Sequence, residues 1–368
     1  MSSPAELPQR LHRILGDVAE RLKLRGADPA LDLAGRFGVR RFVERHVSGG
    51  AELPPSPWLA EGAHMRKEAR RVSRALTEAG VRHCFFKGIA LIGRFYRIDE
   101  RQLADIDLLV DIGQFTDAFT ALHGLGYGEF GSQEAWAPAA RRAGVTMQRG
   151  GGGAGAPRGS VLLDVHWGLE PAETVLTDEE LVLPPTVWPR VESEHGIAIL
   201  PDELHAALVL HHLVRHDLLH VRGLVDFALL WNALPRDAGH ELSELAGVLG
   251  VERALRVIGR VMVDELHLYP LRGVRLGPVG WRDRLAINQL RLRPLLAWAA
   301  RNASDEARHV KVTRSLVWRR FALADTPHAG RLLRDLLAPP REYLAWRWPN
   351  LSSGAMAWRR HLASAFRQ

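Results

Sequence analysis

Four short runs between residues 81 and 167 constrain the fold of this chain more than any other feature. The runs are VRHCFF (81–86), IDLLV (106–110), GVTMQR (144–149) and SVLLDVHW (160–167). Short apolar runs of this kind are typical of strands, whereas helices need longer segments with apolar residues three and four positions apart. We therefore expect a small mixed sheet here, flanked by helices.

Helical spacing dominates the chain before and after these runs. It is found in 5–24, 29–48, 59–79, 116–127 and most of 201–265, and again in 281–301, 305–323 and 328–337. The segment ELPPSPW (52–58) has the composition of a linker. We expect an α+β protein in three parts: an N-terminal helical segment (1–58), an α/β domain (59–200) and a C-terminal helical domain (201–368).

Composition limits the kind of protein this can be. No stretch of about 18 uninterrupted apolar residues is present, so we expect no membrane span. The N-terminal sequence lacks the charged and apolar blocks of a signal peptide. The single cysteine, Cys84, excludes an intramolecular disulfide and a zinc site built from cysteines. These features predict a cytoplasmic protein.

The net charge of +7 suits ligands that carry phosphate. The basic residues are nearly all arginine, which a genome rich in G and C would explain, and they are scattered along the chain. No motif for binding DNA or RNA is present in its expected context, so a dedicated nucleic-acid partner is not expected.

A glycine-rich tract, RGGGGAGAPRG (149–159), joins two of the strand-like runs. A phosphate-binding loop would continue into Gly-Lys-Ser or Gly-Lys-Thr and open a helix, and neither follows here. We interpret the tract as a flexible hairpin connection.

Carboxylates stand on two of the predicted strands. Side chains alternate along a strand, so Asp105 and Asp107 share one face of DIDLLV, and Asp164 shares a face with His166 in LLDVHW. Neighbouring carboxylates repel each other and need a cation or another partner. Magnesium commonly takes one or two carboxylates together with substrate phosphates. Three carboxylates on neighbouring strands would make a two-metal site for phosphoryl transfer.

Each of these residues also has a plainer explanation. Asp105 and Asp107 could form a turn at the entry to the strand, and Asp164 could be a structural acid with a partner. Lys87 could be an ordinary surface lysine, although it follows an apolar strand in a chain with four lysines. His166 could orient the nearby acid or cap the end of its strand.

A row of histidines lies in the helical segment that begins at residue 201. His205, His212, His216 and His220 are spaced so that they share one helical face. Two histidines four residues apart could bind zinc, but no third ligand is evident. We favour a histidine-lined seam that packs against the α/β domain, and zinc remains the alternative.

Taken in order, these motifs resemble the uncharacterised nucleotidyltransferase family of the DNA polymerase β superfamily. The motifs are FFKGIAL, a tyrosine, R-x-x-x-DIDLLV, LDVHW, LPDELHAALVLHHLVRH and RGLVDFALL, and PPREYLAWRWP is a weaker echo near the C-terminus. The resemblance covers about residues 82–232 and implies a polymerase-β-like core. The glycine-serine pair common in the superfamily is absent, and Lys87-Gly88 stands in its place.

The resemblance implies roles for the acidic residues. Asp105 and Asp107 would bind the metal ions and the nucleotide phosphates. Asp164 would be the third metal-binding carboxylate, placed to receive the proton of a substrate hydroxyl.

It also implies contacts with the nucleotide. Gly88 would let the backbone approach the triphosphate closely. Lys87 and Arg101 would neutralise phosphate charge, the arginine through its planar guanidinium, although Arg101 is one of many arginines in the chain.

A second set of residues is expected to face the cleft, where it would help to hold the nucleotide or the second substrate. These residues are His166, His212, His216 and Asp226. For Asp226, a plain helix pair with Arg222 is the alternative.

The activity implied is transfer of a nucleoside monophosphate from a nucleoside triphosphate, with ATP as the expected nucleotide, two Mg²⁺ ions and release of pyrophosphate. The acceptor would be a hydroxyl on a small molecule, a peptide or a protein. Two alternatives stay open: a non-catalytic module that binds a nucleotide or a partner on the same fold, and a toxin-type enzyme that nucleotidylates protein or RNA.

Overall fold

A computed structural model describes most of the first 277 residues. The described residues are 6–49, 53–129 without 55 and 57, 144–149, 160–168, 183–215 and 221–277, scattered positions between 280 and 344, and 353–366. The predicted hairpin connection at 150–159 and the predicted helices at 305–323 and 328–337 lie outside these residues.

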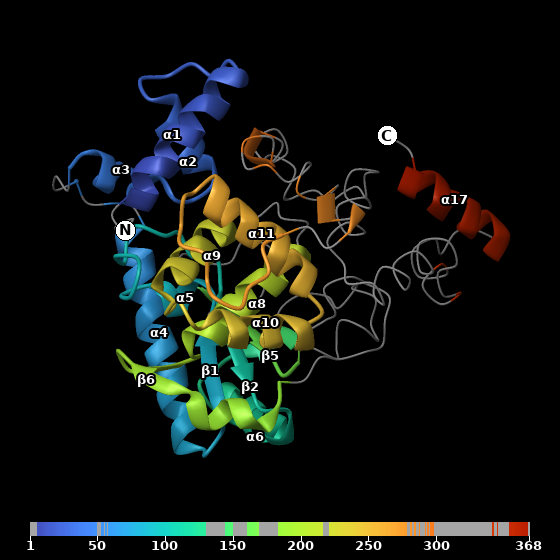
Figure 1. The fold of residues 1–368 in the computed structure, drawn as a ribbon. Helices are drawn as coiled ribbons and strands as arrows, with labels where there is room; N and C mark the ends of the chain where they lie inside the picture. Colours follow the sequence, from blue (N-terminus) through green and yellow to red (C-terminus); the bar gives the residue numbers. More distant parts are fainter. Residues whose placement is uncertain are drawn as a thin grey trace. The chain divides into compact units, whose positions relative to one another are not determined.

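The chain divides into two compact units (Figure 1). An α/β unit comprises residues 38–170 and 178–205, and a helical unit comprises residues 1–37, 171–177 and 206–368. The division at residues 58 and 200 that the sequence suggests stays a prediction.

The α/β unit is built on one mixed sheet with the strand order β3-β4-β5-β2-β1-β7-β6. Its strands are β1 (His83–Phe86), β2 (Ile106–Val110), β3 (Gly128–Glu129), β4 (Gly144–Arg149), β5 (Val161–His166), β6 (Glu192–Glu194) and β7 (Ile197–Ile199). The four predicted strands are confirmed within a few residues, in keeping with an α+β protein. The other three, each of only two or three residues, were not predicted because they are too short to show a periodic pattern.

Helices precede, separate and follow these strands along the chain. They are α3 (Arg40–Val47), α4 (Leu59–Glu78), α5 (Gly88–Leu91), α6 (Phe115–Gly124), the 3-10 helices η1 (Ile112–Gln114) and η2 (Pro185–Arg190), and the first turn of α8 (Asp202–Arg215). The prediction of one continuous helix over 29–48 is wrong. The helix is interrupted at Gly38, between the end of α2 (Pro29–Arg36) and the start of α3. Gly38 has φ 70°, a left-handed conformation that glycine adopts without a steric penalty.

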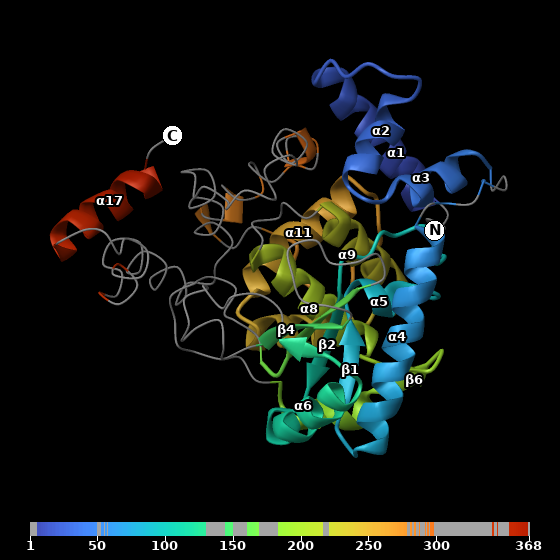
Figure 2. The ribbon, with the colours of Figure 1, turned by 180° about the vertical axis from the view of Figure 1, so that it is seen from behind.

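One face of the sheet packs on α4, which runs beside β1 in both ribbon views (Figures 1 and 2). On this face His83 Nε2 lies 3.0 Å from the hydroxyl of Ser73 on α4, and both residues are buried. Farther along the sheet, Arg149 Nη1 lies 3.1 Å from the buried carboxylate of Glu68, which is also on α4. Apolar side chains complete this core face: Phe85, Leu108, Met147 and Leu163 are all 0% exposed.

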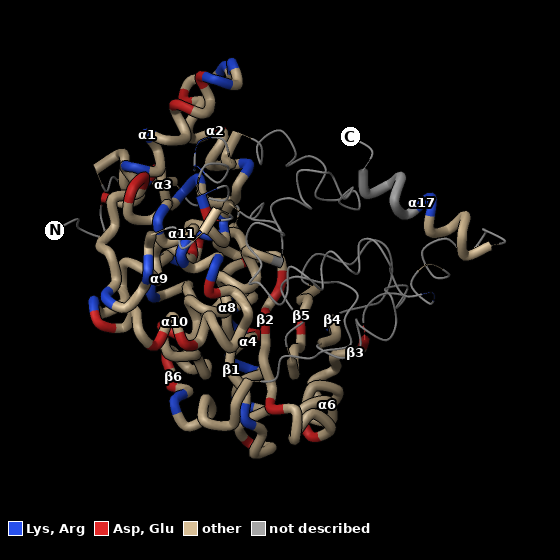
Figure 3. The backbone as a smooth tube through the Cα atoms, turned by 45° about the vertical axis from the view of Figure 1, so that its right-hand side comes forward, with Lys and Arg blue, Asp and Glu red and all other residues tan. Residues whose placement is uncertain are grey.

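The pairing of the strands determines which side chains lie on the other face of the sheet. The parallel pair β2–β5 aligns Asp107 with Asp164, the antiparallel pair β1–β2 aligns Phe86 with Asp107, and the antiparallel pair β4–β5 aligns Thr146 with Asp164. Because directly paired residues project from the same face of a sheet, these four side chains share the face opposite α4. Acidic positions on the neighbouring strands β2 and β5 can be followed in Figure 3.

The helical unit contains α1 (Glu6–Arg21), α2 (Pro29–Arg36), the rest of α8, α9 (Val221–Ala233), α10 (Gly239–Val248), α11 (Glu252–Asp264) and α17 (Gly354–Phe366). Asp28 caps α2 by accepting hydrogen bonds from the backbone N–H groups of Ala30 and Leu31. Arg10 of α1 donates to the carbonyl of Leu266, 2.6 Å away, just beyond α11. This bond ties the first helix of the chain to a segment more than 250 residues later. Among the described residues, no helix has the length and apolar content needed to cross a membrane.

The buried face of β2 gives a test of this core. Leu108 is 0% exposed, so we expect Leu108→Ala to lower the free energy of unfolding by about 2–5 kcal/mol, through lost burial and the cavity left behind. Leu59→Ala is the matched control, because Leu59 is 39% exposed and its change should fall within about 0.5 kcal/mol. Urea titration of both variants measures the difference, and equal losses would contradict this packing.

Candidate functional site

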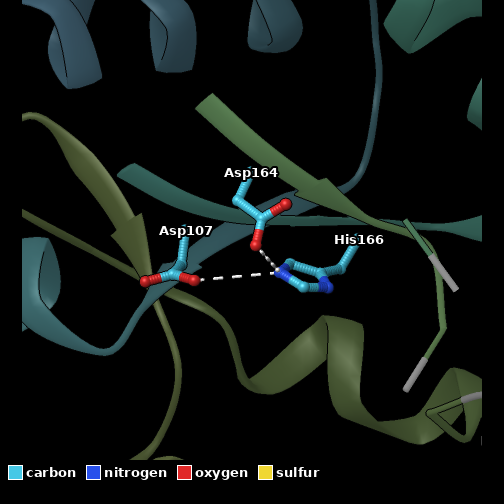
Figure 4. A group of neighbouring side chains, drawn as sticks. All are labelled: Asp107, Asp164 and His166. Carbon is cyan, nitrogen blue, oxygen red and sulfur yellow. Dashed lines mark ion pairs between the residues drawn. The ribbon is translucent and has the colours of Figure 1, made fainter. Parts of the chain in front are cut away.

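Three potential metal ligands converge on the sheet face opposite α4 (Figure 4). Asp107, Asp164 and His166 each offer one ligand atom, and these atoms all lie within 4.8 Å of one another. His166 Nε2 lies 3.1 Å from Asp164 Oδ2 and 3.7 Å from Asp107 Oδ1. A single imidazole nitrogen therefore faces two carboxylates that come from neighbouring parallel strands.

Lys87 supplies a further positive charge. Its Nζ lies 2.5 Å from Asp107 Oδ1, and its side chain is 16% exposed. The residue directly follows β1 and has φ 54° and ψ −137°, a conformation that side-chain-bearing residues seldom adopt. The ring of Phe86 contacts both side chains: Lys87 Nζ lies over it, 5.1 Å from its centroid, and the imidazole of His166 makes a T-shaped contact with ring centroids 5.4 Å apart.

These contacts determine the charge states of the site. Burial by itself would raise the pKa of Asp107, but Lys87 and His166 outweigh it and hold the pKa below its usual value. For Asp164, burial is again opposed, here mainly by His166, and its pKa falls to about 2. Burial disfavours the imidazolium of His166, yet the two carboxylates raise its pKa. Both carboxylates are therefore ionised at neutral pH.

The turn after β1 packs against Arg101. A Cβ atom at Gly88 would lie 1.9 Å from Arg101 Nη1, so only glycine leaves room for the guanidinium there. Arg101 is itself buried. The sequence suggested that Gly88 is needed for the approach of a triphosphate, whereas in the structure the space beside Gly88 is filled by Arg101.

The segment before Arg101 is held by helix α3. Arg41 Nη2 lies 2.7 Å from Asp99 Oδ2, and Arg45 Nε lies 2.6 Å from Glu100 Oε1. Both carboxylates are buried, so these ion pairs fix the approach of the chain to Arg101.

Several predicted site residues lie outside the cluster of three. Asp105 is half-buried and precedes β2 by one residue. His212, half-buried, and Asp226, 2% exposed, belong to the helical unit. His216 lies outside the described residues. Roles for these four residues stay predictions.

The structure adds residues that the motifs did not identify. Thr146 donates a hydrogen bond to Asp164 Oδ1, 3.3 Å away. Two positions farther along β4, Gln148 faces the same side of the sheet by strand alternation. It is 7% exposed, and neither its amide nitrogen nor its amide oxygen has a hydrogen-bond partner within the part of the chain that the structure describes. The sequence signal that could have identified them is the alternation of Thr146 and Gln148 in GVTMQR, the strand that precedes LLDVHW.

The donor set fits a divalent cation. Two ionised carboxylates side by side supply the oxygen ligands that Mg²⁺ prefers, and an imidazole nitrogen is a ligand that Mn²⁺ or Zn²⁺ also accepts. Lys87 places its positive charge beside Asp107, so the site already holds one cationic group next to these ligands.

Comparison with known proteins adds one match. A family model described as uncharacterised nucleotidyltransferase matches residues 60–265, more than half of the chain. The matched range contains the whole sheet, both carboxylates of the cluster, Lys87 and His166. A search of curated proteins found no match.

The contacts of His166 predict an unusual titration. We expect His166 in the metal-free protein to titrate above the ordinary histidine value of 6.5, and Asp107→Asn or Asp164→Asn to lower its pKa. Because the pKa is raised on folding, the stability it contributes is fully present below about pH 6.5 and is lost as the pH rises through the folded value. Imidazole NMR shifts measure this, and a pKa at or below 6.5 would contradict the geometry.

The buried amide of Gln148, which has no hydrogen-bond partner among the residues that the structure describes, predicts a stabilising substitution. We expect Gln148→Leu to raise the free energy of unfolding by about 1 kcal/mol or more, because a buried amide without partners is costly. Gln114→Leu is the matched control: the Gln114 side chain accepts from Arg82 N and donates to Gly80 O, so its loss should destabilise. Denaturant titration compares the two, and a destabilised Gln148→Leu would show that the amide has a partner.

Proposed function

Because the chain belongs to the family of uncharacterised nucleotidyltransferases, we propose that it transfers a nucleoside monophosphate from a nucleoside triphosphate, with ATP as the expected nucleotide, to a hydroxyl acceptor. The observation that carries the proposal is the pairing of Asp107 with Asp164 on adjacent parallel strands, with Lys87 in contact with Asp107. Two carboxylates can hold metal ions, and metal ions together with a lysine neutralise the negative charge of a triphosphate.

We assign the α/β unit to the polymerase-β-like type on the same grounds. The strand β1 leads into the Lys87-Gly88 turn, and its antiparallel neighbour β2 carries Asp107. The parallel neighbour β5 then adds Asp164 on the same face. This order of a turn, a strand with acidic residues and a later acidic strand supports the assignment.

We propose that Asp105, Asp107 and Asp164 hold two Mg²⁺ ions, with His166 as a neighbour of the metal-binding group. When bound, the ions would neutralise the phosphate oxygens and make a bound hydroxyl more acidic. Lys87 and Arg101 would contact the phosphates, and Gly88 would let the guanidinium of Arg101 lie against the turn.

The reaction requires one bond to form and one to break. The acceptor oxygen attacks the α-phosphorus, and the bond from that phosphorus to the oxygen bridging to the β-phosphate breaks. Pyrophosphate leaves with the electron pair, and the hydroxyl proton passes to Asp164. A carboxylate with a pKa of about 2 is a weak base, so this step depends on a hydroxyl that has been made acidic and on release of the contact with His166.

Strand order suggests which side each substrate occupies. The phosphate-binding residues follow β1 on one side of β2, whereas β5 and β4 lie on the other side. An in-line displacement places the entering and leaving oxygens on opposite sides of the phosphorus. We therefore place the acceptor over β5 and β4, where Thr146 offers a hydroxyl and Gln148 offers an amide that has no hydrogen-bond partner among the described residues.

Two alternatives to this function would use the same residues: a binding module without activity and a toxin-type enzyme. A binding module that has lost its activity would often have lost one of the acidic residues as well, so the presence of Asp105, Asp107 and Asp164 favours the enzyme. A toxin-type enzyme acting on protein or RNA would share the site, and only its acceptor would differ.

The carboxylates provide the test of activity. In assays with labelled ATP, CTP, GTP or UTP, Mg²⁺ and candidate hydroxyl acceptors, we expect acceptor-dependent release of pyrophosphate. Asp107→Asn and Asp164→Asn should each lower the rate by a factor of about 10²–10⁴ or more, since the first loses the partner of Lys87 and the second loses the proton acceptor.

Asp117→Asn is the control, because Asp117 is an exposed carboxylate on α6 of the same unit. Its turnover should equal that of the unmodified protein. Full turnover in either site variant, with its fold intact by circular dichroism, would disprove the mechanism.

A further inference from the structure

A buried histidine contacts the backbone of the Lys87 turn. The N–H of Lys87 donates a hydrogen bond to His205 Nε2, 2.9 Å away. His205 is 0% exposed and lies in the first turn of α8, within the α/β unit. The bond joins residues 118 positions apart in the sequence, and neither motif by itself suggests it.

The direction of this hydrogen bond defines which nitrogen of the His205 ring carries a proton. A backbone N–H can only donate, so Nε2 must present its lone pair, and the ring must be neutral with its proton on Nδ1. A side chain without an acceptor at that place would leave the partly buried N–H of Lys87 without this partner.

The backbone of Lys87 needs such support. Its φ of 54° with ψ −137° lies outside the regions that side-chain-bearing residues favour, and such conformations persist where surrounding contacts impose them. This conformation directs the side chain from the end of β1 to Asp107, 2.5 Å away.

A second contact ties the same turn of α8 to the other end of the short helix α5. Arg94, three residues after α5 ends, places Nη2 2.7 Å from Asp202 Oδ1. The four-residue helix α5 is thus held at its start through Lys87 and His205, and beyond its end through Arg94 and Asp202. A helix of this length cannot be stable by itself, so its geometry depends on these contacts.

We propose that His205 is a positioning residue that acts through Lys87. By accepting the Lys87 N–H, it keeps the turn in the strained conformation that brings the ammonium group to Asp107. The link between His205 and Lys87 stands by itself; its importance for turnover rests on the proposed nucleotidyl transfer.

The reactivity of Lys87 tests the link without any need for activity. The full-length protein is treated briefly with an acetylating reagent, and acetylation of each lysine is followed by peptide mass spectrometry. Lys87 should react slowly because it is mostly buried and paired with Asp107, while the exposed Lys67 on α4 serves as the internal reference. In His205→Leu we expect the rate at Lys87, relative to Lys67, to rise roughly tenfold, the size of change that follows the loss of one partly buried hydrogen bond.

Two further variants separate positioning from general destabilisation. His205→Gln keeps an acceptor at the reach of Nε2 and should retain slow labelling, within about twofold of the unmodified protein. His211→Leu removes another buried histidine of α8 and should leave the ratio of Lys87 to Lys67 unchanged. If His205→Leu does not fold, His205→Asn takes its place, since its shorter side chain does not reach the turn.

The results decide the proposal in either direction. Selective labelling of Lys87 in His205→Leu, with protection retained in His205→Gln, supports it. Unchanged protection of Lys87 in His205→Leu, or equal loss of protection in the Gln variant, overturns it. These outcomes do not depend on nucleotidyl transfer; if transfer is observed, the same ranking of His205 variants is expected in kcat.

Discussion

The buried carboxylate of Asp107 is the charge on which the arrangement of the site depends. An ionised carboxylate that is 4% exposed is costly unless cations are held close to it. Lys87, which directly follows β1, provides one, and the imidazole of His166 on β5 lies 3.7 Å from the same carboxylate. The Lys87 turn, the ring of Phe86 that contacts Lys87 and His166, and the second carboxylate, Asp164, all lie around this position.

The sheet keeps this polar group apart from its own core. Residues that alternate with Asp107 and Asp164 along their strands point to α4 and are buried among apolar side chains. The polar residues face the opposite side, where Asp164 is partly exposed. Alternation along three adjacent strands thus lets one small sheet provide both a stable core and a cluster of ionised groups.

Contacts outside the cluster hold its parts in place. Arg101 fills the space beside Gly88, and ion pairs from α3 hold the segment that leads to Arg101. The first turn of α8 holds both ends of α5. The nucleotidyltransferase site that we propose would therefore be supported by segments from residue 41 to residue 205, most of which make no contact with the carboxylates.

The sequence by itself determined the four main strands, the positions of Asp107, Asp164 and Lys87, and the family resemblance, because these depend on local periodicity and on short motifs. It also identified His166 as a neighbour of Asp164, since the two share one strand. Only the tertiary structure decided that His166 faces both carboxylates, that Arg101 packs on Gly88, and that His205 accepts a hydrogen bond from the Lys87 N–H. Strand register and helix placement bring those partners together across long separations in the chain, and no local pattern records that pairing.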